Sequence, residues 1–199
     1  EKLFLSSFYY KGDKKTKFAC VRFGNVLGSR GSILPLFKKQ IKNNGGIAIT
    51  NPTMTRFVMS IPQAAGLVLS ATNLMRGQEV FVLKMPAVRL SDLAKAAVKH
   101  YAPMFGKKPS EVEIKIVGKR VGEKTHEKLL ADYELARALE TKDMYILTPH
   151  ETVAYSDYKE KYAARPIQIG DKAFSSKHAP KLSESKLAEL VKEADFHQS

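Results

Sequence analysis

Three short segments carry polar or cationic side chains where one predicted element gives way to the next, and two of them also contain glycine. They are residues 22–32, 54–57 and 120–127. Ligands of open α/β sheets bind at such boundaries, because the loops at the carboxyl ends of parallel strands meet there. These three segments therefore hold the candidate binding residues.

Two arginines in these segments have the chemistry to hold a diphosphate. Arg56 lies between a turn and a predicted helix start, where the apolar Phe57 is expected to fix its position. The guanidinium is a planar fork that matches phosphate oxygens, so a second fork from Arg120 would clamp the same diphosphate. Glu123 can orient Arg120 or accept from a ribose hydroxyl. A surface salt bridge between Arg120 and Glu123 is the simpler alternative.

The first segment is glycine-rich and carries Asn25 at the end of a predicted strand. Glycine lets the backbone approach a ligand closely, and an asparagine side chain can donate and accept hydrogen bonds in one contact. A strand-to-helix turn that needs glycine for its geometry explains the same residues. Both explanations stay open on the sequence alone.

No metal site is predicted. His126 lies beside Glu127, but a zinc-protease helix needs two histidines four residues apart with a glutamate next to the first, and the other four histidines also lack ligand spacing. His126 is expected on a helix face with a structural hydrogen bond. Cys20 is expected to be a core residue; as the single cysteine it cannot form an internal disulfide, which suits a reducing cytoplasm.

The basic composition should attract anions, although a solvated basic surface explains most of the lysines. Lys and Arg number 33 against 20 Asp and Glu, which gives a net charge of +13. The lysines are scattered in pairs and form no basic stripe with interleaved aromatics, so nucleic-acid binding is not expected. No apolar run approaches the roughly 20 residues of a membrane-spanning helix, and no signal-peptide pattern opens the sequence.

The elements that would position these residues alternate between strands and helices, which predicts the α/β class. Strands are expected over 18–23, 46–50, 80–85 and 112–116, and the first has the apolar character of a buried parallel strand. Helices are expected over 1–10, 33–41, 61–76, 91–101 and from 183 onward. A further helix that carries Leu129 and Leu130 is expected after residues 118–124, and 150–182 is expected to be a polar arm that lies on another surface.

Two serines are predicted to begin helices. Ser60 and Gln63 have the spacing of a capping box, and Ser91 is expected to cap the helix over 91–101. The helix over 61–76 has an apolar face, which is expected to pack in the core and consists of Ala64, Leu67, Val68, Ala71, Leu74 and Met75.

Taken in this order, the three segments resemble the polysaccharide-biosynthesis branch of the extended short-chain dehydrogenases, which includes UDP-N-acetylglucosamine 4,6-dehydratases. The similarity runs from residue 1 to about 149 and is most specific in 22–32 with Pro35, in 52–57, and in the Gly-Glu-Lys-x-His-Glu core of 120–127. The resemblance implies the C-terminal part of an extended Rossmann-type fold, with the last parallel strands and the smaller substrate-binding domain. The implied divisions are the end of the NAD(P)-binding domain over 1–32, the UDP-sugar-binding domain over 33–149, and a polar arm with a C-terminal helix over 150–199.

The resemblance also implies roles for individual residues. Asn25 would contact the sugar or its phosphate, and Val26 would lie near the nicotinamide of NADP. Arg56 and Arg120 would grip the diphosphate, with Glu123 near the ribose. The remaining implied substrate contacts are Arg30, Gly31 and Ser32, which would line the pocket, and Ile47 and Ile49, past which the uracil would lie.

The family's catalytic parts are expected elsewhere. The family binds NAD(P) through a glycine-rich first strand-to-helix turn and uses a tyrosine–lysine acid/base pair, and both precede a segment like residues 1–4. We therefore expect a C-terminal portion with no catalytic residue and no turnover by itself. The mechanism implied for a complete enzyme oxidises the sugar C4 hydroxyl with NADP, removes water across C5 and C6, and returns hydride to C6.

The predicted function is the UDP-sugar-binding portion of a UDP-N-acetylglucosamine-type 4,6-dehydratase in surface-polysaccharide or glycan precursor biosynthesis. A UDP-sugar 4-epimerase of the same branch, a non-catalytic UDP-sugar-binding remnant and a basic interaction module are the alternatives. The expected partners are the UDP-sugar and either further copies of the chain or a partner chain with the cofactor half.

Overall fold

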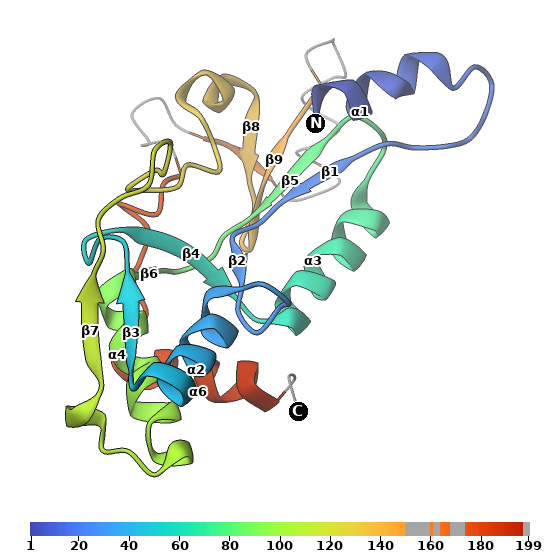
Figure 1. Cartoon of the computed structure of the whole chain (residues 1–199). Coiled ribbons are helices and arrows are strands. Elements are labelled where there is room, and N and C mark those ends of the chain that lie inside the picture. Colours follow the sequence, from blue (N-terminus) through green and yellow to red (C-terminus); the bar gives the residue numbers. More distant parts are fainter. Residues whose placement is uncertain (150–159, 161–163, 168–173, 197–199) are drawn as a thin grey trace. The chain divides into compact units, whose positions relative to one another are not determined.

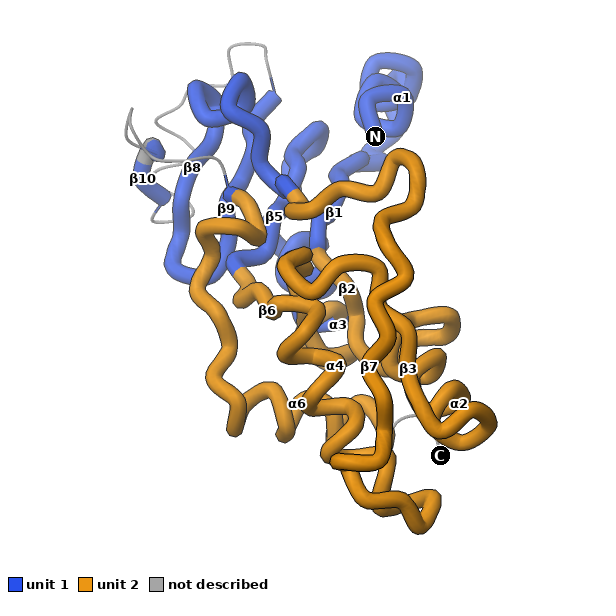
Figure 2. The backbone as a smooth tube through the Cα atoms, turned by 60° about the vertical axis from the view of Figure 1, so that its left-hand side comes forward, with its two compact units in different colours: residues 1–23, 65–84, 128–174 blue, residues 24–64, 85–127, 175–199 orange. Residues whose placement is uncertain are grey.

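The computed structural model describes residues 1–149, 160, 164–167 and 174–196 (Figure 1). The chain divides into two compact units, each built from separate stretches of sequence (Figure 2). Unit 1 consists of Glu1–Phe23, Ala65–Lys84 and Lys128–Phe174, and unit 2 of Gly24–Ala64, Met85–Glu127 and Ser175–Ser199. The division by function at residues 32 and 149 stays a prediction.

Unit 1 is built on a five-stranded mixed sheet. Its strands, in spatial order, are β1 (Cys20–Arg22), β5 (Val80–Leu83), β9 (Met144–Leu147), β8 (Ala138–Glu140) and β10 (Arg165–Pro166). β1 pairs in parallel with β5, with Cys20 opposite Val80, and the other pairs are antiparallel. The predicted parallel strand within 18–23 is confirmed. The predicted first helix is present as α1 (Lys2–Ser6) followed by the 3₁₀ helix η1 (Ser7–Tyr10).

The predicted helix around Leu129 and Leu130 is wrong. Both residues precede the 3₁₀ helix η4 (Asp132–Arg137), and their amides donate to the carbonyl of Phe174 at 3.0 and 3.5 Å. Leu130 is 1% exposed and packs among the strands of unit 1. A hydrogen bond to a distant segment therefore replaces the local helical one, which the local sequence does not reveal.

Unit 2 contains two small sheets. In the first, β4 (Thr55–Met59) lies between β2 (Asn25–Val26), to which it is parallel, and β6 (Ala87–Arg89), to which it is antiparallel. In the second, β3 (Gly46–Ile49) pairs in parallel with β7 (Glu113–Ile116). The predicted strands over 46–50 and 112–116 are confirmed. β4 was not predicted, because four of its five residues are buried and it shows no alternation.

Helices α2 (Ile33–Asn44), α4 (Leu90–Tyr101) and α6 (Glu184–Phe196) share one hydrophobic core in unit 2. α2 was predicted over 33–41, with its end signalled by residues 43–46; it runs to Asn44 and is ended by Gly45, where φ is 70°. Two short 3₁₀ helices, η2 (Pro103–Phe105) and η3 (Pro109–Glu111), follow α4. The predicted helix from 183 onward is confirmed, and its apolar positions that are buried are Leu187, Val191 and Ala194.

The helix starts confirm one predicted cap and correct another. At α3 (Ile61–Leu74), the Ser60 amide donates to Gln63 Oε1 at 2.8 Å and the Gln63 amide to Ser60 Oγ at 3.4 Å, which is a capping box. The cap at Ser91 is wrong, because α4 begins one residue earlier and the Ser91 hydroxyl donates to Asp92. On α3, Leu67 and Ala71 are buried as predicted. Val68 is 45% exposed, so its assignment to the core is wrong.

Part of the predicted arm belongs to the compact units. Residues 150–159, 161–163 and 168–173 lie outside the described residues. In the described part, β10 pairs with β8 within unit 1, and Ser176 is fully buried in unit 2. For these residues the prediction of an arm on another surface is wrong. Within the part of the chain that the structure describes, no helix is both long and apolar enough to cross a bilayer.

Candidate functional site

Unit 2 contains a cavity of about 410 Å³, a size typical of small-molecule sites. Another cavity of about 740 Å³ lies in the same unit, lined by residues of α4, β7 and α6 and by none of the predicted site residues. The predicted residues that line the 410 Å³ cavity are Asn25, Val26, Arg30, Gly31, Ser32, Ile49, Arg56, Arg120 and Glu123. Ile47 does not line it and is a core residue, 2% exposed. We name the 410 Å³ space the arginine cavity.

The turn that follows β2 brings Asn25 and Ser32 to the arginine cavity. A Cβ at Gly24 would lie 2.4 Å from Phe57 Cβ, and one at Gly28, where φ is 83°, would lie 2.7 Å from the Ala194 carbonyl oxygen. These glycines are therefore required by the packing of the turn. The geometric explanation of the glycine-rich segment holds, and the cavity-lining position of Asn25 is additional to it.

The start of α2 gives the cavity an electropositive wall. Ser32, the N-cap, and Ile33, the first helical residue, both line the cavity. The first amides of a helix lack helical acceptors and attract anions. The Ser32 hydroxyl is buried and has no hydrogen-bond partner within the described residues.

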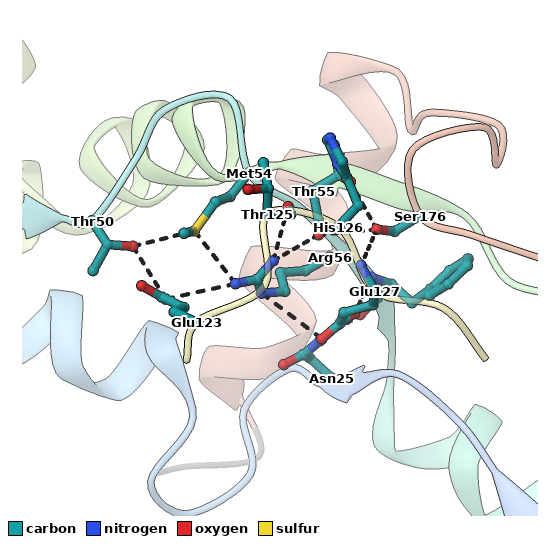
Figure 3. Close-up of polar contacts among 11 residues, drawn as sticks. Asn25, Thr50, Met54, Thr55, Arg56, Glu123, Thr125, His126, Glu127 and Ser176 are labelled. Atoms are coloured by element: carbon teal, nitrogen blue, oxygen red, sulfur yellow. Dashed lines mark hydrogen bonds and ion pairs between the residues drawn. The ribbon is translucent and has the colours of Figure 1, made fainter. Parts of the chain in front are cut away.

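Arg56 is held on β4 by carbonyls and carboxylates, as Figure 3 shows. Its Nη1 donates to the carbonyls of Thr55 at 2.9 Å and Thr125 at 3.2 Å. Its Nη2 lies 3.6 Å from Glu123 Oε1, and its Nε lies 3.8 Å from Glu127 Oε1. The side chain is 19% exposed, so the guanidinium is both fixed in place and accessible from the cavity.

Glu123 is bound to Arg56 and not to the Arg120 side chain. Glu123 Oε1 accepts from the Thr50 hydroxyl at 3.2 Å, and Oε2 accepts from the backbone amide of Arg120 at 3.3 Å. Among the described residues, the salt bridge weighed for Arg120 and Glu123 is not formed. The Arg120 side chain is exposed at the cavity wall.

Glu127 contacts two candidate site residues, Asn25 and Arg56, and the sequence analysis missed it. Its Oε2 accepts from the Phe57 amide at 2.8 Å, and its two oxygens accept from Asn25 Nδ2 at 3.0 and 3.2 Å. Asn25 Nδ2 also donates to the Phe57 carbonyl at 3.0 Å. Glu127 was weighed only as part of a metal site beside His126. Its position at the end of the Gly-Glu-Lys-x-His-Glu core could have identified it as a candidate.

His126 forms a structural hydrogen bond, as predicted, but lies outside any helix. Its Nδ1 lies 2.8 Å from Thr55 Oγ1, which in turn lies 2.7 Å from Ser176 Oγ. Burial, and then the positive charges of Lys177 and Lys181, lower the pKa of His126 below its ordinary value. In the described part of the chain, no group of three or more His, Cys, Asp or Glu side chains is placed to hold a metal ion.

The sequence was also expected to contain no tyrosine with a lysine at the spacing of the family's acid/base pair, and that expectation is wrong. A tyrosine followed by a lysine four residues later occurs twice, at Tyr10 and Lys14 and at Tyr155 and Lys159. Tyr10 is 87% exposed at the end of η1 in unit 1 and does not line the arginine cavity. Tyr155 and Lys159 lie outside the described residues. Neither pair is placed at the cavity by the described structure.

Cys20 lies in β1 as predicted and is partly buried. Burial, followed by the charge of Glu1, raises the pKa of its thiol. A raised pKa keeps the thiol protonated and poorly nucleophilic, as a structural cysteine requires.

Comparison with known proteins places these features in one family. A model described as "Polysaccharide biosynthesis protein" matches residues 1–149. The chain is 44% identical to an uncharacterized membrane protein of Methanocaldococcus jannaschii, over 98% of the chain and 55% of that protein. It is 34% identical to a UDP-glucose 4-epimerase of Rickettsia bellii, over 100% of the chain and 56% of the relative. It is 32% identical to a UDP-N-acetylglucosamine 4,6-dehydratase (inverting) of Campylobacter jejuni, over 96% of the chain and 56% of that relative.

A solved structure agrees with the observed fold. The X-ray structure of Pen from Bacillus thuringiensis superposes with a TM-score of 0.84 at 33% sequence identity and covers 98% of this chain. Only 55% of that protein is matched, so the chain spans about half the length of the relatives described above. The mixed architecture with parallel strand pairs and this superposition confirm the predicted α/β class.

Proposed function

Since this chain belongs to the polysaccharide biosynthesis protein family, a branch of the extended short-chain dehydrogenases with a Rossmann-type fold, we propose that its unit 2 holds the UDP-sugar substrate of a 4,6-dehydratase. One observation carries the proposal. Asn25, Arg56, Arg120 and Glu123, which come from three separate segments, line the same 410 Å³ cavity.

The chemistry of the cavity suits a nucleoside diphosphate. The Arg56 guanidinium is fixed by the carbonyls of Thr55 and Thr125, and the exposed Arg120 supplies a second fork. The start of α2 adds partial positive charge at Ser32. Glu123 contributes a carboxylate that can accept from the ribose hydroxyls.

The part of this chain in the reaction is positioning. A substrate held by its diphosphate presents its sugar in one orientation, and such orientation lowers the barrier of the later steps. Bound NADP supplies the reversible hydride transfer in this family. Val26 lies beside Asn25 at the cavity wall, and its apolar, partly exposed side chain fits a contact with the nicotinamide ring.

A 4-epimerase is the second candidate, and one observation favours it. The relative named UDP-glucose 4-epimerase is as similar to the chain as the dehydratase is, at 34% against 32% identity. Both reactions use a diphosphate-held sugar, so the cavity serves either. A remnant that binds UDP-sugars without turnover requires the same contacts.

Calorimetric titration of the chain with UDP, UDP-N-acetylglucosamine and ADP tests the proposal. We expect binding of both uridine ligands, weaker binding of ADP, and loss of all binding in the double variant Arg56→Ala with Arg120→Ala. The control is Arg89→Ala, which removes an exposed arginine of β6 outside the cavity. Equal binding of ADP and UDP, or binding that survives the double variant, would support the basic interaction module instead.

Product analysis separates the catalytic alternatives. The pure 199-residue chain is expected to release no product. The protein as its source makes it, supplied with NADP, is expected to convert UDP-N-acetylglucosamine to a 4-keto-6-deoxy product with loss of one water. Conversion of UDP-glucose to its C4 epimer without loss of water would establish the epimerase, and no conversion of either would establish the remnant.

A further inference from the structure

The nitrogen of the Asn25 side-chain amide donates hydrogen bonds to two acceptor groups. Asn25 Nδ2 donates to the Phe57 carbonyl at 3.0 Å and to the Glu127 carboxylate at 3.0 and 3.2 Å. A carbonyl and an ionised carboxylate only accept hydrogen bonds, so both partners require the nitrogen of the amide to face them. The orientation of the amide therefore follows from the network around it.

We infer that Glu127 is a positioning residue that turns Asn25 so that its carbonyl oxygen, and not its nitrogen, is offered to the substrate. Both hydrogens of Nδ2 are engaged, and Oδ1 is the polar atom of this side chain to which the described residues supply no partner. An amide oxygen accepts from a hydroxyl or an N–H, and it repels the acceptor-only oxygens of a phosphate. Asn25 consequently recognises a donor on the sugar and makes no direct contact with the diphosphate.

Glu127 can do this because its own position is fixed from several directions. Its Oε2 accepts from the Phe57 amide at 2.8 Å, and its Oε1 lies 3.8 Å from Arg56 Nε. The carboxylate thus joins the diphosphate residue Arg56 to the sugar residue Asn25 (Figure 3). A glutamine would present an amide nitrogen to one of these donors and would lose at least one of the three contacts.

The backbone of Glu127 is anchored by Ser176, which lies beyond the residues matched by the family. The Glu127 amide donates to Ser176 Oγ at 2.8 Å, and the Ser176 amide donates to the Glu127 carbonyl at 2.8 Å. Ser176 Oγ also donates to the Thr55 carbonyl at 3.0 Å and is fully buried. These bonds hold Glu127 next to β4, the strand that carries Arg56.

This inference rests on the proposed function and assigns its sugar recognition to one atom. The test is the ratio of the dissociation constants of UDP and UDP-N-acetylglucosamine, measured by calorimetry on the full chain. In Asn25→Ala and in Glu127→Gln, we expect affinity for the UDP-sugar to fall relative to UDP by about 5- to 10-fold, the effect of one hydrogen bond. The control is Glu113→Gln, which removes the same charge from an exposed position on β7, outside the cavity.

A double-mutant cycle distinguishes positioning from a general structural effect. If Glu127 acts through Asn25, Glu127→Gln changes the ratio no further in the Asn25→Ala background. Additive changes would overturn the inference. Thermal unfolding of each variant checks that it is folded, and Asn25→Ala, at an exposed residue, keeps the test decisive if Glu127→Gln does not fold.

The possible failures give different results. If wild-type protein binds neither ligand, the proposed function fails and the inference fails with it. If wild-type protein binds both ligands and the variants lose affinity for UDP and UDP-sugar equally, Asn25 contacts the shared diphosphate; the inference then fails and the proposed function stands. If neither variant changes the ratio or the affinity for either ligand, the inference fails and the proposed function stands.

Discussion

Arg56 Nη2 lies 3.6 Å from Glu123 Oε1, and both residues line the arginine cavity. Glu123 is held there by Thr50 and by the Arg120 amide, so the carboxylate occupies a defined position beside the guanidinium. A bound diphosphate would compete with this carboxylate for Arg56. Under the proposed function, the pairing would keep the cation in place before the ligand arrives, at the cost of part of the binding energy.

Arg56→Lys is expected to bind UDP less well than wild type and better than Arg56→Ala. Lysine keeps the charge but lacks the planar fork, whereas alanine also leaves Glu123 and Glu127 without their shared cation. Loss of a charged hydrogen bond corresponds to about 10- to 100-fold in affinity for Arg56→Ala. Calorimetry with UDP measures the affinities of wild type and the two variants and so gives their order. Equal affinities for lysine and arginine at position 56 would exclude a bidentate contact.

Ser32→Ala is expected to weaken binding of the UDP-sugar without destabilising the fold. The Ser32 hydroxyl is buried without a partner in the described structure and makes no capping bond, so its removal relieves an unsatisfied polar group. The free energy of unfolding should stay unchanged or rise by about 1 kcal/mol in urea titrations. Affinity for the UDP-sugar should fall. A destabilised variant with unchanged affinity would mean that the hydroxyl serves the fold.

Gly24→Ala is expected to destabilise unit 2. The added Cβ would lie 2.4 Å from Phe57 Cβ and 2.6 Å from its carbonyl oxygen, and β4 would have to shift. Overpacking of this kind costs about 1–3 kcal/mol, which urea unfolding can measure. The matched control is Gly66→Ala on α3, where nothing lies within 4 Å of the new Cβ. In a helix this control should be neutral or stabilising by up to about 1 kcal/mol, and equal effects at both glycines would contradict the packing described for β2 and β4.

The stability of unit 2 is expected to decrease in mild acid through His126. Because burial and the charges of Lys177, Lys181 and Arg56 lower its pKa, the unfolded chain binds a proton more readily than the folded one. The free energy of unfolding then falls as the pH drops below about 6.5, the ordinary histidine pKa, toward the lower folded value. Urea unfolding at several pH values should show a steeper decrease for wild type than for His126→Gln. Parallel curves would show that His126 does not titrate in this way.

The sequence alone predicted the elements that are marked by a pattern among neighbouring residues. α2 shows an apolar stripe and a glycine stop, and the capping box of Ser60 and Gln63 is a four-residue pattern. β2, β4 and β6 were not predicted, because their segments show neither the alternation nor the bounded apolar run by which the other strands were recognised.

The site was predictable where residue chemistry is specific and unpredictable where it depends on distant contacts. Arg56 and Arg120 were identified from the geometry of the guanidinium group and both line the cavity. Glu127 lies 102 residues from Asn25 in the sequence, and Ser176 lies 121 residues from Thr55. Their hydrogen bonds exist only in the folded chain. The Gly-Glu-Lys-x-His-Glu core includes Glu127 but does not indicate that it contacts Asn25.

A crystal structure of the chain with bound UDP tests the central claim most directly. We predict density for the diphosphate in the arginine cavity, within hydrogen-bonding distance of the Arg56 and Arg120 guanidinium groups and beside the start of α2 at Ser32. UDP bound in the 740 Å³ cavity lined by α4, β7 and α6, or a diphosphate that contacts neither arginine, would contradict the account.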